Sequence, residues 1–108
     1  MSIELKELKN FRLFREKSFM VNVPASFVTD TNSEQSVLIQ GVIDLLAVKD
    51  GKAQILDYKY SVHGEKVLKQ RYSKQLELYS YAVENVLGLE VTKKIIVNIF
   101  NGDLIEIN

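Results

Sequence analysis

The stretch GVIDLLAVKDGKAQILDYKY, residues 41–60, constrains the fold of this sequence more than any other segment. Apolar and β-branched residues fill both of its halves, which is typical of strands, here at about residues 37–48 and 53–60. Asp50 and Gly51 lie between the halves, and Asp-Gly is a favoured pair for a two-residue hairpin turn. The stretch therefore predicts an antiparallel hairpin, and the turn determines which residues of the two strands face each other.

The predicted turn brings three charged side chains together. Counting back from it pairs Lys49 with Lys52 and, farther along the strands, Asp44 with Asp57. Because successive side chains alternate between the two faces of a strand, Asp57 and Lys59 point the same way, and Asp44 joins them from across the ladder. The alternative is a three-residue loop with a glycine bulge, which would shift this register by one residue.

Both faces of the predicted hairpin are largely apolar, so the strand pair should be covered on both sides. Ile43, Leu45, Ala47 and Leu56 lie on one face, and Val42, Leu46, Val48 and Ile55 lie on the other. Two carboxylates that face each other there are destabilising, and partial burial increases the penalty. A divalent cation bound by both would offset it, and all-oxygen ligands suit magnesium or manganese. The plainer alternative is a pair of solvated acids at strand ends.

The remaining segments predict a mixed sheet with helical cover. One segment has apolar residues three or four positions apart, which is the spacing of a helix face. These residues are Tyr72, Leu76, Tyr79, Val83 and Val86. Helices are expected at residues 3–10 and 66–87, a polar loop at 29–36, and further strands at 12–23, 93–100 and 103–107. Pro24 ends the first strand, Gly88 follows the long helix, and Asn101-Gly102 is a hairpin-type turn before the last strand. The order α, β, β, β, α, β, β indicates an α/β (α+β) fold.

Composition narrows the classes of protein. At 108 residues, 46% hydrophobic and 26% charged, the chain can form one compact domain with a core. No apolar run approaches the roughly 20 residues of a membrane-spanning helix, and the N-terminus lacks the pattern of a secretory signal. The absence of cysteine excludes thiolate zinc sites and cysteine nucleophiles and fits a cytoplasmic protein. Acidic and basic residues cancel, so a DNA partner has to be argued from local sites.

Three ordered motifs, GVID, DYK and QLELYSYA, resemble those of the PD-(D/E)xK nuclease superfamily and, within it, the RecB/AddA-type nuclease domain. The pattern of that domain runs G-x-[IV]-D, then D-Y-K, then Q-x-x-x-Y on a helix. The resemblance is close over residues 41–82, and the element order is similar to a restriction-endonuclease-like αβββαβ core over most of the chain. It implies that residues 1–108 are a single nuclease domain, the C-terminal part of a larger helicase–nuclease subunit.

The resemblance assigns roles to the charged residues of the hairpin. Asp44 and Asp57 would bind the catalytic Mg²⁺ (or Mn²⁺), and the backbone carbonyl of Tyr58 would complete the metal shell. Lys59 would orient the attacking water or help to deprotonate it. The physical chemistry agrees, since phosphodiester hydrolysis needs an activated water and positive charge near the phosphate.

Outside these residues the resemblance is less complete. Gln75 and Tyr79 match the helical motif and would support the site or contact the substrate. Glu16 is similar to a glutamate often found before the first strand, although an exposed surface glutamate is the commoner situation. RecB-like nucleases also have a histidine ligand upstream of the first strand. His63, the one histidine of this chain, follows the D-Y-K motif and cannot take that role, which leaves the activity of the isolated chain open.

Basic and aromatic residues of the long helix are candidates for DNA contacts. Lys66, Lys69, Arg71 and Lys74 could bind phosphates, and an ordinary solvated helix face is the alternative. Tyr72, Tyr79 and Tyr81 are candidates for base stacking. Their helical spacing favours core packing for the first two.

The resemblance, together with these residues, implies a Mg-dependent deoxyribonuclease that hydrolyses phosphodiesters by water attack. The resemblance further implies exonucleolytic processing of DNA ends in recombinational repair, on single strands delivered by a helicase domain in a complex with a partner subunit. One alternative is a catalytically inert nuclease-like module for DNA binding or subunit docking. Another is a small stand-alone resolvase or restriction-type enzyme that dimerises and cuts duplex DNA. No membrane partner is expected.

Overall fold

A computed structural model describes residues 8–28 and 35–107 of the chain. In chain order the elements are β1 (Arg12–Pro24), α2 (Ala25–Val28), β2 (Ser36–Lys49), β3 (Lys52–Lys59), α3 (Glu65–Val86), β4 (Glu90–Asn98) and β5 (Leu104–Ile107). The alternation of strands with one long helix confirms the predicted α/β character.

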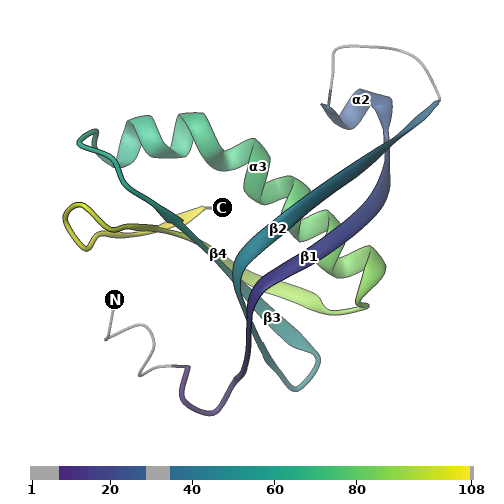
Figure 1. Ribbon diagram of the computed structural model, residues 1–108, viewed down its shortest axis with the longest axis horizontal. Helices are drawn as coiled ribbons and strands as arrows, with labels where there is room; N and C mark the ends of the chain where they lie inside the picture. Colours follow the sequence, from purple (N-terminus) through teal and green to yellow (C-terminus); the bar gives the residue numbers. More distant parts are fainter. Residues whose placement is uncertain (1–7, 29–34, 108) are drawn as a thin grey trace.

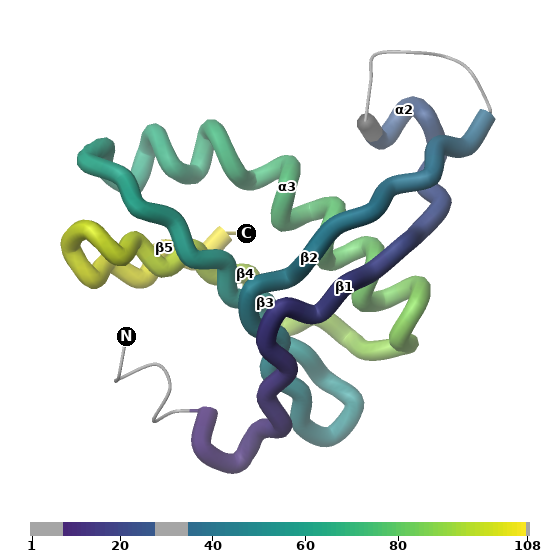
Figure 2. Tube along the Cα trace, viewed as in Figure 1, coloured from purple at the N-terminus to yellow at the C-terminus, as the bar shows by residue number. Residues whose placement is uncertain are grey.

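The five strands form one sheet in the order β1-β2-β3-β4-β5. Neighbouring strands are antiparallel except for β3 and β4, which are parallel. The helix α3 connects these two parallel strands and lies across one face of the sheet (Figure 1). The strands β1 and β2 continue together as a long twisted arm that leads to α2 (Figure 2). The result is the mixed sheet with helical cover that the sequence predicts.

The predicted hairpin register is confirmed from the turn to Leu45, and the predicted pair of Asp44 with Asp57 lies just beyond the end of the ladder. The strands β2 and β3 pair residue by residue from the turn as far as Leu45 opposite Leu56. Asp50 and Gly51 both have positive φ angles, 52° and 76°, as a two-residue type I′ turn requires. The bulged alternative, with its register shift, is therefore excluded.

The helix and strand that follow the hairpin are present with shifted ends. The helix predicted at residues 66–87 is α3, which begins and ends one residue earlier. The strand predicted at 93–100 is β4, but it begins at Glu90 and ends at Asn98. Residues 101–102 consequently lie inside a longer connection to β5 rather than forming the whole turn.

Two predicted elements fall largely outside the described residues. The helix expected at residues 3–10 depends on residues 1–7, and the polar loop expected at 29–36 depends on residues 29–34. The strand that Pro24 was expected to end is β1, whereas the short helix α2 after it was not predicted. Within the described part of the chain, no helix is long and apolar enough to cross a membrane.

The core lies on both faces of the hairpin strands, as their composition predicts. On one face, Leu68, Leu76 and Val83 of α3 pack against buried residues of β2, β3, β4 and β5. On the opposite face a smaller cluster is buried, which consists of Leu8, Leu45, Ala47, Leu56, Ile95 and Val97. The middle of β2 and the interior of β3 therefore lie in an apolar environment, which matters for any charged group placed there.

The predicted division of the two faces is wrong at Ile43. This residue packs with Leu46 on the α3 side, while Leu45 packs on the other side. Residues three positions apart can share a face only if the alternation of the strand is interrupted between them. The interruption lies opposite Glu16, which has a φ of 52° in the middle of β1. Both strands therefore bend at this point, next to Asp44.

Replacing Leu76 by alanine should lower the free energy of unfolding by about 2–5 kcal/mol, because its side chain is fully buried between α3 and the sheet. The matched change Leu38→Ala, at a half-exposed leucine of β2, should lower it by less than about 1 kcal/mol. Urea unfolding followed by circular dichroism measures both. Equal losses would show that α3 does not cover the sheet in this way.

Candidate functional site

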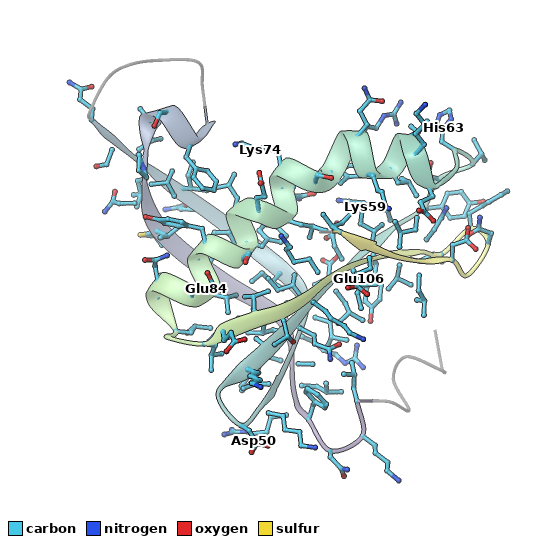
Figure 3. The ribbon with its side chains drawn as sticks, turned by 180° about the vertical axis from the view of Figure 1, so that it is seen from behind. Asp50, Lys59, His63, Lys74, Glu84 and Glu106 are labelled. Carbon is cyan, nitrogen blue, oxygen red and sulfur yellow. The ribbon has the colours of Figure 1, made fainter. Side chains whose placement is uncertain are left out.

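The end of β3 contains an ion pair between a buried carboxylate and a partly exposed ammonium. Asp57 is 2% exposed. The Nζ atom of Lys59 lies 3.1 Å from Asp57 Oδ2 and 4.5 Å from the ring centroid of Tyr72 on α3. Lys59 is thus held beneath the N-terminal half of α3 (Figure 3). A carboxylate and an ammonium are therefore fixed side by side where β3 leaves the sheet.

Asp44 joins this ion pair from β2, at the point where the β2–β3 ladder stops. The last paired residues are Leu45 and Leu56. Beyond them the Tyr58 N–H donates a hydrogen bond to Asp44 Oδ2, at 2.9 Å. A side-chain carboxylate there satisfies a backbone donor that strand pairing leaves free. The Asp44 carboxyl also raises the pKa of the neighbouring Asp57 carboxyl.

Burial and the neighbouring Asp44 carboxyl change the acidity of Asp57. Burial raises the pKa of the Asp57 carboxyl from 3.8 to about 6, and the proximity of Asp44 adds to the rise. The Lys59 ammonium opposes this rise without cancelling it. A proton on Asp57 removes the repulsion between the two neighbouring carboxyl groups. Above the pKa of Asp57 the pair therefore favours a cation between the two groups.

The donor atoms of this pair fit a hard divalent cation. Asp57 Oδ2 is buried and, apart from its ion pair with Lys59, accepts no well-aligned hydrogen bond. Carboxylate and carbonyl oxygens are the ligands that Mg²⁺ uses, usually with several waters retained. In the described part of the chain, no three histidine, cysteine, aspartate or glutamate side chains group together to hold a metal, and His63 is exposed at the N-terminal end of α3 (Figure 3). Among residues 8–28 and 35–107, the site therefore offers a metal ion two side chains, Asp44 and Asp57.

A cavity of about 470 Å³ opens beside Asp44. It is lined by Arg15, Glu16, Asp44 and Tyr58. The sequence favoured an ordinary surface position for Glu16, and the residue is indeed exposed. It lies opposite Asp44, however, and its own φ angle is positive. Nothing in a strand pattern signals such a conformation. The cavity gives water or a phosphate group access to the Asp44 side of the site.

Gln75 and Tyr79 lie one turn apart on α3 and interact with each other. Gln75 Nε2 donates a hydrogen bond to the Tyr79 hydroxyl, at 2.8 Å. Burial, and then the negative charge of Asp57, raises the pKa of the Tyr79 phenol, so the phenol stays neutral. The negative charge of the carboxylate pair therefore acts on the Tyr79 phenol. A role for these two residues in supporting the site or touching a substrate stays a prediction.

The absence of a side chain at Gly41 allows the aromatic contact that positions Tyr79. Gly41 of β2 faces Phe19 of β1 in the strand register. A Cβ atom on Gly41 would lie 2.7 Å from the Phe19 ring. That ring meets the ring of Tyr79 edge-on, with centroids 5.4 Å apart. The first residue of the GVID motif therefore lets an aromatic ring cross the strand and pack against α3, a contact that sequence reasoning missed.

The four basic residues expected to bind phosphate differ in their surroundings along α3. Lys66 and Arg71 are exposed, and Lys69 is ion-paired within its own helix, at 3.0 Å. Lys74 lies farther along α3, with its Nζ 4.6 Å from the ring centroid of Phe27 (Figure 3). Only the first three therefore lie in the N-terminal third of α3, and their contact with DNA stays a prediction.

Comparison with known proteins gives consistent matches. A model described as the PD-(D/E)XK nuclease superfamily matches residues 2–103. Two similar curated proteins are ATP-dependent helicase/nuclease subunits of the AddA type. The one from Ligilactobacillus salivarius (strain UCC118) is 38% identical over 102 residues, and the one from Bacillus pumilus (strain SAFR-032) is 39% identical over 116 residues. The alignments cover 90% and 95% of this chain but 8% and 9% of the relatives, so the chain spans less than a tenth of their length.

The raised pKa of Asp57 predicts how the metal-free protein responds to pH. Its folded pKa, about 6, exceeds the ordinary 3.8, so its protonation stabilises the fold at low pH, and this contribution is lost as pH rises from about 4 to about 6. In EDTA, the free energy of unfolding of the wild type should fall by on the order of 2 kcal/mol relative to that of Asp57→Asn over this pH interval. Urea unfolding at stepped pH measures the difference. Asp103→Asn, at an exposed loop carboxylate, is the control and should show no such divergence from wild type.

The Gly41 contact predicts a specific pattern of rescue. Gly41→Ala should lower the free energy of unfolding by about 1–3 kcal/mol, because the new methyl group displaces the Phe19 ring. The double variant Gly41→Ala/Phe19→Leu should be more stable than the sum of the two single changes implies, by about 1 kcal/mol. Strictly additive losses in a urea-unfolding cycle would contradict the proposed packing.

Proposed function

This chain belongs to the PD-(D/E)XK nuclease superfamily, and from that membership together with the site we propose that it is a metal-dependent DNA nuclease domain. The observation that carries the proposal is the meeting of Asp44, Asp57 and Lys59 where the pairing of β2 with β3 stops. Two carboxylates beside an ammonium, next to an open cavity, are suited to hydrolysis of a phosphodiester.

Each residue of the site has a chemical role in this proposal. Asp44 and Asp57 would hold one divalent ion, Mg²⁺ or Mn²⁺, with the backbone carbonyl of Tyr58 as a further ligand. The ion, when bound, would lower the pKa of a water and offset negative charge on the phosphate. Lys59, fixed by Asp57 and the Tyr72 ring, would orient the attacking water and stabilise charge on the phosphoryl oxygens.

The biological setting is part of the same proposal. The relatives, which are named as ATP-dependent helicase/nuclease subunits, support a chain that works beside a helicase domain within a longer protein. We place its activity in the cytoplasm, on DNA ends during recombinational repair, with exonucleolytic cleavage of single strands and a partner subunit. The same relatives count against a stand-alone restriction-type enzyme, because they are more than ten times as long as the matched segment.

A second candidate function is a nuclease-like module without catalysis, used for DNA binding or subunit docking. The observation that favours it is the small number of metal ligands. Asp44 and Asp57 have no third histidine, cysteine or carboxylate grouped with them among the described residues. Two protein carboxylates are nevertheless sufficient for Mg²⁺, which retains water in its shell, so catalysis remains the preferred proposal.

Cleavage and metal binding, measured on the same preparations, test the proposal. Asp57→Asn and Asp44→Asn should lower Mg²⁺-dependent cleavage of a single-stranded oligonucleotide by about a hundredfold or more. Both should also weaken Mn²⁺ binding measured by titration calorimetry, because each removes a ligand charge. Lys59→Met should lower cleavage comparably while leaving Mn²⁺ bound, because the ammonium is not a ligand.

The matched control is Asp103→Asn, an aspartate outside the site, which should behave as wild type. Metal binding that is absent from wild type, or unchanged by both site variants, would favour the inert module. Cleavage that survives both aspartate substitutions would rule out catalysis by this site.

A further inference from the structure

The fold leaves two aromatic rings on its surface and partly buries the rest. The chain has five phenylalanines, five tyrosines and no tryptophan. All ten lie in the described residues, and eight of them are partly buried against the protein. The two exposed ones are Tyr60, at 72%, and Phe100, at 49%. The tyrosines of α3 that the sequence suggested for base stacking are engaged internally, since Tyr79 contacts Phe19 and Tyr81 contacts Phe27.

The two exposed rings touch each other beside the carboxylate site. Their centroids are 5.4 Å apart and their planes are nearly perpendicular, at 84°. Tyr60 directly follows Lys59, and Phe100 comes shortly after the end of β4. Because β3 and β4 are adjacent and parallel, both rings leave the sheet at the same edge. Tyr60 lies three residues beyond Asp57, a separation of roughly 10 Å in extended chain.

A buried amide holds the loops that carry the rings. Asn98, which faces Lys59 across the β3–β4 pair, is 1% exposed. Its Nδ2 donates to the Ser61 carbonyl at 3.0 Å, and its Oδ1 accepts from the N–H groups of Ser61 and Phe100 at 3.2 and 3.1 Å. The Ile99 N–H donates to the Lys59 carbonyl at 2.8 Å. The loops on either side of the ring pair are therefore tied to each other, so the rings are held in place before any ligand binds.

The surroundings of the ring pair favour an anionic partner. The segment that follows Tyr60 carries Lys66, Lys69 and Arg71 and one acidic residue, Glu65, which is paired with Lys69, while the loop after Phe100 adds one exposed acid, Asp103. Aromatic rings next to basic side chains are the combination that binds single-stranded nucleic acid, because bases stack on the rings and phosphates lie near the cations. An apolar segment of a protein would use the rings without needing the basic residues.

We propose that Tyr60 and Phe100 form a stacking subsite for unpaired bases of a nucleic-acid strand, next to the phosphodiester held at Asp44 and Asp57. This inference rests on the proposed nuclease function for the position of the scissile phosphate. The subsite selects unpaired bases, because a base inside a duplex has both of its faces covered by its neighbours. Asn98 is its positioning residue, since it fixes both loops without reaching the strand.

Binding of a labelled oligothymidylate in EDTA, where no cleavage occurs, tests the subsite. The probe is compared with an abasic strand of the same length, which keeps the phosphates and lacks the bases. Wild type should bind the thymidine strand about tenfold more tightly than the abasic strand. Tyr60→Ala and Phe100→Ala should each reduce that preference, and the double variant should abolish it, while Tyr60→Phe keeps it. Asn98→Ala should reduce it with both rings present.

The control is Met20→Ala, which removes an exposed apolar side chain from the β1–β2 arm and should leave the preference unchanged. Thermal unfolding of each variant shows whether it is folded. Equal binding of the two strands by wild type, or an unaltered preference in the folded double variant, would overturn the proposal. The second result would point to a protein partner on this surface.

Failure of the subsite and failure of the nuclease proposal give different results. If Tyr60→Ala and Phe100→Ala bind as wild type does while Asp57→Asn abolishes cleavage, the subsite is wrong and the nuclease proposal stands. If the thymidine preference depends on the two rings but no cleavage depends on Asp57, bases bind here and the catalytic proposal fails.

Discussion

The interaction on which the rest of the site depends is the hydrogen bond from the Tyr58 N–H to the Asp44 carboxylate. It forms where β2 and β3 stop pairing, so a side chain completes what the backbone ladder leaves open. Had the ladder continued, the Tyr58 N–H would have had a backbone acceptor. The Asp44 carboxylate would then lack the hydrogen-bond donor that fixes its position. The end of strand pairing is therefore what directs one carboxylate toward Asp57 and its lysine.

The long helix gives this meeting point its chemical character. By covering one face of the sheet, α3 removes water from Asp57 and places the Tyr72 ring beside Lys59. Removal of water strengthens every charge interaction in the site and also makes two neighbouring carboxylates unfavourable without a cation. The same packing thus explains the raised pKa of Asp57 and the suitability of the site for a divalent ion. The burial that stabilises the fold therefore also makes the negative charge of Asp57 unfavourable unless a cation lies beside it.

The edge of the sheet joins the catalytic proposal to the stacking proposal. Parallel pairing of β3 and β4 brings the loop after Lys59 next to the loop after Asn98, although 39 positions separate these two residues in the sequence. A buried amide then holds the two loops together. Carboxylates, an ammonium and two open aromatic rings consequently lie along one edge, an arrangement suited to a strand whose phosphate and bases are bound at once.

The sequence by itself determined the hairpin register, the long helix and the motif residues, because an Asp-Gly turn, periodic spacing and ordered motifs are local signals. Only the tertiary structure decided that Ile43 and Leu45 lie on different faces, that Glu16 lies opposite Asp44, and that Gly41 makes room for Phe19. It also decided which aromatic rings are exposed. These features depend on a bend shared by two strands and on contacts between distant segments. A pattern of alternating residues carries no information about either.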